Sequence, residues 1–341
     1  MSGTYKTVAG IGSTMTAMSA HSRSGPYLYL LITMVLFGTA FTGSKVVVGE
    51  VPHDVAAMLR FGGAAVFLVL LLGLSRDGSR FRWRDLVVVG GAGLIGIFAY
   101  NFFFFWGLTL SPAVDGSLIV PVFSPVLTTV ALLVSGRETA SALRITGLLT
   151  GVAGAVVFFV GISVGGVSGA RVGGDLLYVL AAACWAVYSI ISKKVLRGMA
   201  PLRATTYATG VGALALAVAA IPSLSTTDWA GVRPSTWAIV AFLAIGPTAI
   251  AYLFYFRALR SVGPVTATIS MFTVPVFGTV SSVVFLGESF TAIQAVGALI
   301  TIAGALLAVL QGSGKARQST ADSGGSGLAP AGERASSTSM T

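Results

Sequence analysis

The segment GESFTAIQAVGALITIAGALL, from Gly287 to Leu307, is a near copy of the earlier segment GRETASALRITGLLTGVAGAVV, from Gly136 to Val157. From Glu138 onward the two copies align at a constant offset of 150 residues. The matched positions include Glu138 with Glu288, Gly147 with Gly297, and Gly154 with Gly304. An internal repeat of this length sets the architecture of the whole chain. The sequence therefore predicts two halves built on one plan.

The composition is that of a membrane protein. Of the 341 residues, 55% are hydrophobic and 9% are charged, whereas soluble domains carry about 25% charged residues. So few charges cannot cover a water-exposed surface, so most of the surface must face lipid. The 43 glycines fit this reading because small residues allow membrane helices to approach closely. The fold class predicted is an all-α polytopic membrane protein.

Ten segments are long and apolar enough to cross a hydrocarbon core, which takes roughly 20 helical residues. They are residues 28–48, 54–74, 86–108, 112–134, 143–164, 174–195, 203–221, 236–256, 264–286 and 291–310. Residues 1–26 are predicted to be a disordered leader and residues 312–341 a disordered tail, because neither has enough apolar surface to fold. Between them, residues 27–164 and 174–310 form the two repeats.

The positions of Lys and Arg predict the orientation of the spans. Alternate loops hold nearly all of the basic residues, and the opposite loops hold only Arg171 and Arg233. Basic loops stay on the cytoplasmic side, so both termini are expected to be cytoplasmic. Each half has five spans, an odd number, so the two copies must cross in opposite directions. Inverted repeats place a substrate site near the midplane and allow alternating access.

Further motifs carry a resemblance to a known family. They include Phe37-Gly38 with Lys45, Pro52 with Arg60-Phe61, and Ser124-Pro125-Val126, and the second half has Trp185-Ala186, Arg257-Ala258, Pro275-Val276 and Gly287-Glu288. Over residues 28–310 the chain resembles the drug/metabolite transporter superfamily, in particular its EamA-type ten-span exporters. The resemblance implies secondary export of small metabolites, such as amino acids or their derivatives, or of toxic compounds.

Two basic residues lie inside predicted spans. Lys45 is near the end of the first span, where a long side chain can reach the interface; alternatively it presents a fixed charge to a central cavity. Arg60 lies deeper in the second span, where a charge is costly and marks a candidate site; a structural ion pair with Asp54 or Asp115 is the alternative. If both face the cavity, they would attract a substrate carboxylate.

Asp115 begins the fourth span. An acid near a helix N-terminus is favoured by the helix dipole alone. The functional alternative is a carboxylate that couples transport to a proton or another cation.

Polar aromatic and amide side chains are candidates to line a cavity. They are Tyr100, Asn101, Trp185, Tyr188 and Tyr252. Plain core packing and an interfacial aromatic belt are the alternatives. Four prolines inside spans are candidate helix kinks: Pro121, Pro125, Pro247 and Pro275. Glu138 and Glu288 are expected to cap helices or anchor loops, and the glycine pairs Gly147/Gly154 and Gly297/Gly304 to allow close helix packing.

The sequence argues against several classes of function. The histidines, His21 and His53, lie outside the predicted spans, and Cys184 is the only cysteine, so neither a catalytic constellation nor a metal site is expected. No cofactor is expected, and without a G-x4-GK[ST] loop an ion gradient or exchange with a counter-substrate must drive transport. The basic residues form no nucleic-acid-binding patch. A channel or a membrane sensor is the alternative to a carrier. The expected location is the plasma membrane of a bacterium.

Overall fold

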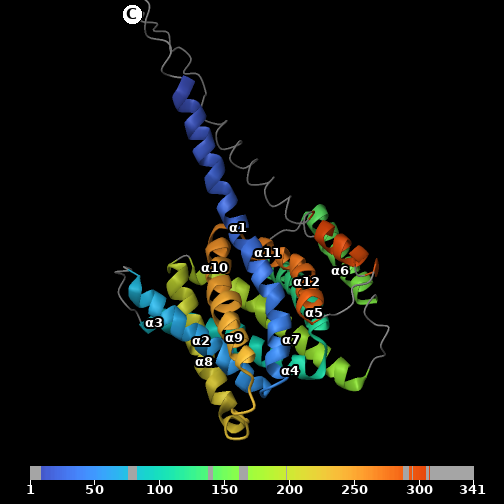
Figure 1. The fold of residues 1–341 in the computed structure, drawn as a ribbon. Helices are drawn as coiled ribbons and strands as arrows, with labels where there is room; N and C mark the ends of the chain where they lie inside the picture. The colour runs from blue at the N-terminus through green and yellow to red at the C-terminus, as the bar shows by residue number, and fades with distance from the viewer. Residues whose placement is uncertain are drawn as a thin grey trace, which may run out of the picture.

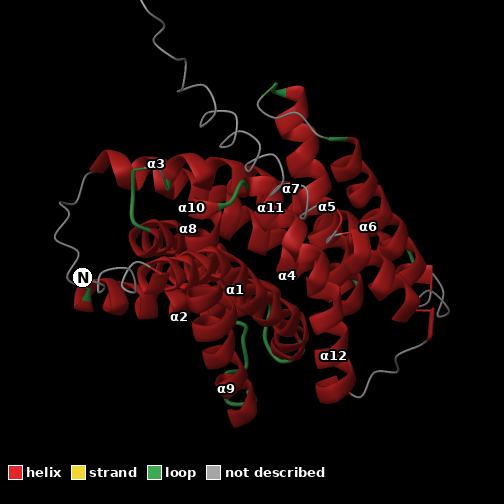
Figure 2. Ribbon diagram, turned by 90° about the horizontal axis from the view of Figure 1, so that it is seen from above, coloured by secondary structure: helices red, strands yellow, loops and turns green. Residues whose placement is uncertain are grey.

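A computed structural model of the protein describes residues 9–75, 83–136, 141–160, 168–196, 198–286, 292–293, 295–304 and 307. These residues form helices joined by short links (Figures 1 and 2). Among the described residues, eight helices are long and apolar enough to cross a membrane by length and composition, and two shorter apolar helices accompany them. The prediction of an all-helical polytopic membrane protein is therefore confirmed, and the two shorter helices fall where the fifth and tenth spans are expected.

The first half contains α1 to α6. Their bounds are α1 Ala9–Val48, α2 His53–Leu74, α3 Trp83–Gly93, α4 Tyr100–Leu110, α5 Ala113–Val134 and α6 Ala142–Val160. A π-helical turn, Leu94–Ala99, joins α3 to α4, so that residues Leu86–Leu110 form one span.

The second half repeats this order. Its elements are α7 Gly169–Val195, α8 Pro201–Leu224, α9 Pro234–Leu243, α10 Ala251–Ser261, α11 Pro264–Ile269, α12 Val274–Leu286 and a last short helix, Ala295–Gly304. A π-helical turn, Ala244–Ile250, joins α9 to α10, and a 3-10 turn, Ser270–Thr273, joins α11 to α12.

The third span of each half is interrupted at the same register. The π turn at Leu94–Ala99 in the first half corresponds to the one at Ala244–Ile250 in the second, at the offset of 150 residues that relates the repeats. In the second half Pro247 lies inside the π turn, and a proline cannot donate the regular backbone hydrogen bond. The duplication therefore extends to irregular backbone as well as to helix order.

α6 and the last short helix pack directly against each other through glycine. A Cβ at Gly154 would overlap the backbone nitrogen of Thr301, and a Cβ at Gly304 would overlap the backbone of Gly151. Figure 1 shows α6 beside the last helix at one side of the bundle, and Figure 2 shows α6 at its edge. Glu138 and Glu288 lie outside the described residues.

Residues 9–26 of the predicted leader lie within the described helix α1. α1 already begins at Ala9, whereas its apolar span begins at Gly25, and the first part of the helix projects from the bundle in Figure 1. The reason is local, because no proline precedes Pro26 and alanine and methionine favour helix. The predicted tail, residues 312–341, lies outside the described residues.

Candidate functional site

A small cavity lies among helices of both halves. Its lining residues are Phe37, Ala40, Phe41, Arg60, Tyr100, Phe104, Val120, Pro121, Trp185, Tyr252, Met271 and Val274. The cavity has a volume of about 20 Å³. Since a water molecule needs about 10–15 Å³, there is room for roughly one. The helices around the cavity therefore leave almost no open space between them.

Arg60 is the only charged residue in the lining, and only 5% of its surface is exposed. Its Nε donates a hydrogen bond to Thr248 Oγ1 (2.8 Å), and a terminal nitrogen donates to Ser44 Oγ (3.2 Å). Its guanidinium carbon lies 5.2 Å from the Phe61 ring centroid. Within the part of the chain that the structure describes, no carboxylate forms an ion pair with Arg60. A buried cation without an anion is costly, and here neutral hydroxyls and an aromatic ring surround it.

The Thr248 hydroxyl, which accepts the hydrogen bond from Arg60 Nε, directly follows Pro247 in the π turn. Pro247 has no N–H to give to the Leu243 carbonyl one turn earlier, and in this π turn the Thr248 hydroxyl donates to that carbonyl (2.8 Å). With its proton committed there, the Thr248 oxygen is free to accept from Arg60 Nε. Pro247 thus contributes to the site through the π turn, although it does not line the cavity.

Trp185 is the centre of an aromatic cluster in the wall of the cavity. Its ring lies edge-on to Phe37 (5.5 Å between centroids) and to Tyr252 (5.5 Å), and tilted against Tyr100 (5.3 Å). Among the described residues, Trp185 Nε1 makes no hydrogen bond of good geometry, although the Tyr255 hydroxyl lies beside it. This donor therefore lies in the wall of the cavity beside the Tyr255 hydroxyl.

The structure brings four of the predicted cavity residues together, namely Arg60, Tyr100, Trp185 and Tyr252. Asn101 is buried next to them, and its amide donates to Ile97 O (2.7 Å) while its oxygen has no well-formed bond among the described residues. Tyr188 does not line the cavity, but its ring lies 5.8 Å from the Trp185 ring and packs against Gly96.

Among the predicted kinks, Pro121 lines the cavity and Pro125 lies one turn further along α5. Pro275 lies at the start of α12, directly after the 3-10 turn. Phe37, Phe41, Phe104 and Thr248 were not among the predicted site residues. Apolar side chains in an apolar span give no sign of which face meets a cavity.

Lys45 lies at a helix end and is not among the residues that line the cavity. Its Nζ donates to Leu108 O (2.7 Å) and Ser111 O (3.3 Å), where α4 ends. A cation there also interacts favourably with the helix dipole.

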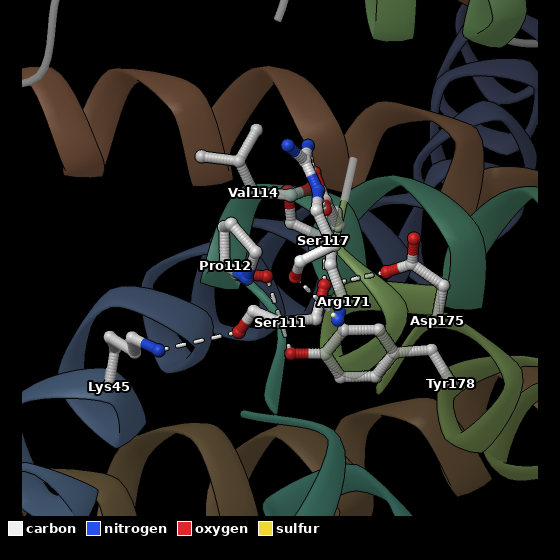
Figure 3. A network of polar contacts seen from close by, with 10 residues as sticks. Lys45, Ser111, Pro112, Val114, Ser117, Arg171, Asp175 and Tyr178 are labelled. Atoms are coloured by element: carbon white, nitrogen blue, oxygen red, sulfur yellow. Dashed lines mark hydrogen bonds and ion pairs between the residues drawn. The ribbon is translucent and has the colours of Figure 1, made fainter. Parts of the chain in front are cut away.

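Asp115, the other predicted site residue near the end of α4, is fully buried and forms a bidentate ion pair with Arg171. Arg171 Nε donates to Asp115 Oδ2 (2.6 Å), and a terminal nitrogen donates to Oδ1 (2.9 Å). The Ser111 hydroxyl lies within hydrogen-bonding distance of Asp115 Oδ2 (3.0 Å) and of Asp175 Oδ1 (2.6 Å), as Figure 3 shows for Asp175. Neither Arg171 nor Asp175 was predicted as part of a site. Asp54 accepts instead from Ser223, so neither Asp54 nor Asp115 is the partner of Arg60.

Comparison with known proteins places the two halves in one family. The EamA-like transporter family model matches residues 25–160 and again residues 172–310. The chain is 26% identical to the uncharacterized transporter YyaM of Bacillus subtilis, over 83% of this chain and 92% of that protein. It is 29% identical to a probable terminal-alkyne amino-acid exporter of Streptantibioticus cattleyicolor, over 85% of this chain and 95% of that protein.

Two further similarities extend over nearly the whole length of the other protein. The aromatic amino acid exporter YddG of Ancylobacter novellus is 28% identical over 85% of this chain and 98% of that protein. A crystal structure of a protein 25% identical in sequence has a TM-score of 0.67, over 86% of this chain and 99% of the other.

Proposed function

Because the chain belongs to the EamA-like transporter family, we propose that it is a secondary transporter that exports small organic carboxylates, such as amino acids or their derivatives, by alternating access. The family is one of transporters and not of enzymes. The observation that carries the substrate class is Arg60, a buried guanidinium in the central cavity with no carboxylate partner among the described residues. A substrate carboxylate would supply the missing anion, and a guanidinium can bind one through two parallel hydrogen bonds.

The rest of the cavity fits a substrate with an apolar or aromatic portion. Six of the twelve lining residues are aromatic, and aromatic rings can also hold an ammonium group by cation–π attraction. Trp185 Nε1 offers one further hydrogen-bond donor. Two of the similar proteins are described as exporters of amino acids, which supports the same substrate class.

Alternating access is supported by signs that the two halves are inverted. Lys45 caps the third span of its own half, beside the N-terminal turns of α7, where Arg171 and Asp175 lie. Lys193, at the other end of α7, donates to Leu259 O (2.7 Å) and Val262 O (2.6 Å) at the end of the third span of the second half. At about 1.5 Å per residue, the 27 residues of α7 extend for roughly 40 Å. The equivalent caps therefore lie at opposite ends of one membrane-spanning helix.

We infer ten spans, with both termini in the cytoplasm of a bacterium and the chain in its plasma membrane. At the Lys45 end the described residues include Arg171, in the first turn of α7, and Arg233, and each is paired with an acid, Asp115 and Glu50 respectively. The opposite end holds Lys193, Lys194, Arg203 and Arg260. By the positive-inside rule the Lys45 end faces outward.

The cavity must open for a substrate to enter. Ligand pockets usually measure about 300–1,000 Å³, whereas this one is about 20 Å³. We infer that the structure represents a closed intermediate, and that the two halves separate at one end or the other. A proton gradient or exchange with a counter-substrate would drive the cycle.

Counterflow in proteoliposomes tests the proposal. The full chain is reconstituted with an internal aromatic amino acid, and uptake of the labelled amino acid is compared with uptake of its decarboxylated amine. We expect saturable exchange of the amino acid and little of the amine. Arg60→Gln should abolish the exchange. Arg257→Gln, which removes an exposed cation from the helix that carries Tyr252, should leave it unchanged.

Flux that rises linearly with concentration would indicate a channel instead. Equal transport of the amine and the amino acid, or full exchange by Arg60→Gln, would rule out Arg60 as the carboxylate site.

A further inference from the structure

The Ser111 hydroxyl lies between two carboxyl groups. Its oxygen is 3.0 Å from Asp115 Oδ2 and 2.6 Å from Asp175 Oδ1. A hydroxyl has one proton to donate, so it can donate to only one of the two. For both contacts to be hydrogen bonds, a second proton must lie on one of the carboxyl groups.

The contacts of Asp115 show which carboxyl group that is. Both oxygens of Asp115 accept hydrogen bonds from the Arg171 guanidinium, at 2.6 and 2.9 Å, and its side chain is fully buried. A bidentate pair of this kind requires an ionised carboxylate. The Ser111 hydroxyl therefore donates to Asp115, and the shorter contact is a hydrogen bond in which Asp175 donates to Ser111.

Other groups around this point come from three helices. From α1 comes Lys45, whose Nζ donates to the carbonyl oxygens of Leu108 and Ser111. From α5 comes Asp115, and from α7 come Arg171, which pairs with Asp115, and Tyr178. The Tyr178 hydroxyl donates to Pro112 O (3.3 Å). Figure 3 shows Lys45, Arg171, Asp175 and Tyr178 converging on the Ser111–Pro112 link between α4 and α5. The link belongs to the first half of the chain and α7 to the second.

We propose that Asp175 is a proton-binding site. Its protonated form donates a hydrogen bond to Ser111 and thereby holds α7 against the α4–α5 link. The inference rests on the proposed function only in that the two halves must part at this end during transport. Loss of the proton leaves one hydroxyl proton between two carboxylates, so one of the two contacts is lost and the carboxylates repel each other. The junction is therefore held at low pH and weakened as pH rises.

The site is accessible to protons from one side of the membrane. Asp175 is half-buried near the N-terminal end of α7, whereas Asp115 behind it is fully buried. With the Lys45 end facing outward, Asp175 would respond to the pH of the external medium. Acidification outside would close the outer end of the cavity and would favour the inward-open state that reloads substrate.

Infrared difference spectroscopy of the full chain in lipid nanodiscs tests the proton directly, with no need for a substrate. We expect a protonated-carboxyl band in the wild type that disappears as pH rises. Asp175→Asn should remove this band. The matched control is Asp54→Asn, since Asp54 faces a single serine, Ser223, whose one proton is enough for the pair. That variant should keep the band. A band that persists in Asp175→Asn, or one that is absent at every pH in the wild type, overturns the proposal.

The fastening itself is tested by the pH dependence of thermal unfolding. A folded state that holds a proton which the unfolded chain has released loses stability as pH rises. We expect this decline in the wild type and in Asp54→Asn. Asp175→Asn should flatten it, because an amide donates to Ser111 at every pH. Ser111→Ala, which removes the bridging hydroxyl, should flatten it at a lower unfolding temperature. Equal slopes in the wild type and Asp175→Asn would contradict the proposal.

These two measurements are independent of transport. If no carboxylate is exchanged in proteoliposomes, the proposed substrate class fails while the infrared and unfolding results still decide the proton site.

Discussion

Pro247 and Arg60 come from different halves of the chain and are linked through one hydroxyl group. Pro247 leaves the Leu243 carbonyl without its regular N–H donor, Thr248 donates to that carbonyl, and Arg60 donates to Thr248. The irregular backbone of the second half thereby orients the one charge in the cavity lining, which comes from the first half. A site shared in this way depends on the relative position of the halves.

Thr248 is accordingly a positioning residue for Arg60. Thr248→Val removes the acceptor of Arg60 Nε while nearly keeping the side-chain volume. We expect the guanidinium to shift and KM for an amino acid substrate to rise about tenfold, because one hydrogen bond to a charged group is worth about 1.5–3 kcal/mol. Thr248→Ser, which keeps the hydroxyl, should restore KM. Counterflow kinetics on the two variants measure this. Equal KM values in both would show that Thr248 only packs.

Arg60 is expected to lower the stability of the folded protein although transport requires it. Replacement of a buried ionic group by an apolar one of similar volume is often neutral or stabilising by about 1–4 kcal/mol. We expect Arg60→Met to raise the unfolding temperature in detergent and to abolish transport. Thermal unfolding followed by tryptophan fluorescence measures the first effect. A clear fall in the unfolding temperature would mean that Arg60 has a structural role as well.

Lys45 and Lys193 are expected to be structural rather than substrate-binding. Each donates to carbonyl oxygens at the end of a third span, so Lys45→Met and Lys193→Met should each cost about 1.5–3 kcal/mol of stability. KM should change little in protein that remains folded. Lys194→Met, at an exposed neighbouring position, is the control and should be neutral. A large rise in KM for Lys45→Met at unchanged stability would restore the alternative that Lys45 attracts substrate.

Sequence patterns predicted the helices well and the direction of side chains poorly. Hydropathy locates Arg60 deep in a span and Lys45 near an end, but both residues remained candidates because depth does not show which face of a helix meets the cavity. The cap formed by Lys45 depends on where α4 ends in space, 63 residues further along the chain. Asp175 was not singled out, because the sequence does not show that its carboxyl group lies beside Ser111, 64 residues earlier in the chain. Pro247 was marked as a kink, but its effect on Thr248 depends on the π turn.

Glycine packing between α6 and the last helix should tolerate no side chain. A Cβ at Gly154 or Gly304 would overlap backbone atoms of the partner helix, and overpacking typically costs about 1–3 kcal/mol. We expect Gly154→Ala and Gly304→Ala to lower the unfolding temperature. Gly73→Ala, where a Cβ would meet nothing within 4 Å, should be neutral or stabilising. If all three variants unfold alike, the close approach of the two helices is wrong.

The two loops that flank α8 should lie on opposite sides of the membrane. Gly198 lies among Lys193, Lys194 and Arg203, which predicts a cytoplasmic position, whereas Ala230 lies in the loop whose Arg233 pairs with Glu50. In a Cys184→Ser background, we expect an impermeant maleimide added to intact cells to label Ala230→Cys and to reach Gly198→Cys only after permeabilisation. The reverse pattern would invert the proposed orientation and place Asp175 at the cytoplasmic end. Labelling of both positions from one side would contradict the membrane crossing of α8 and with it the inverted arrangement of the halves.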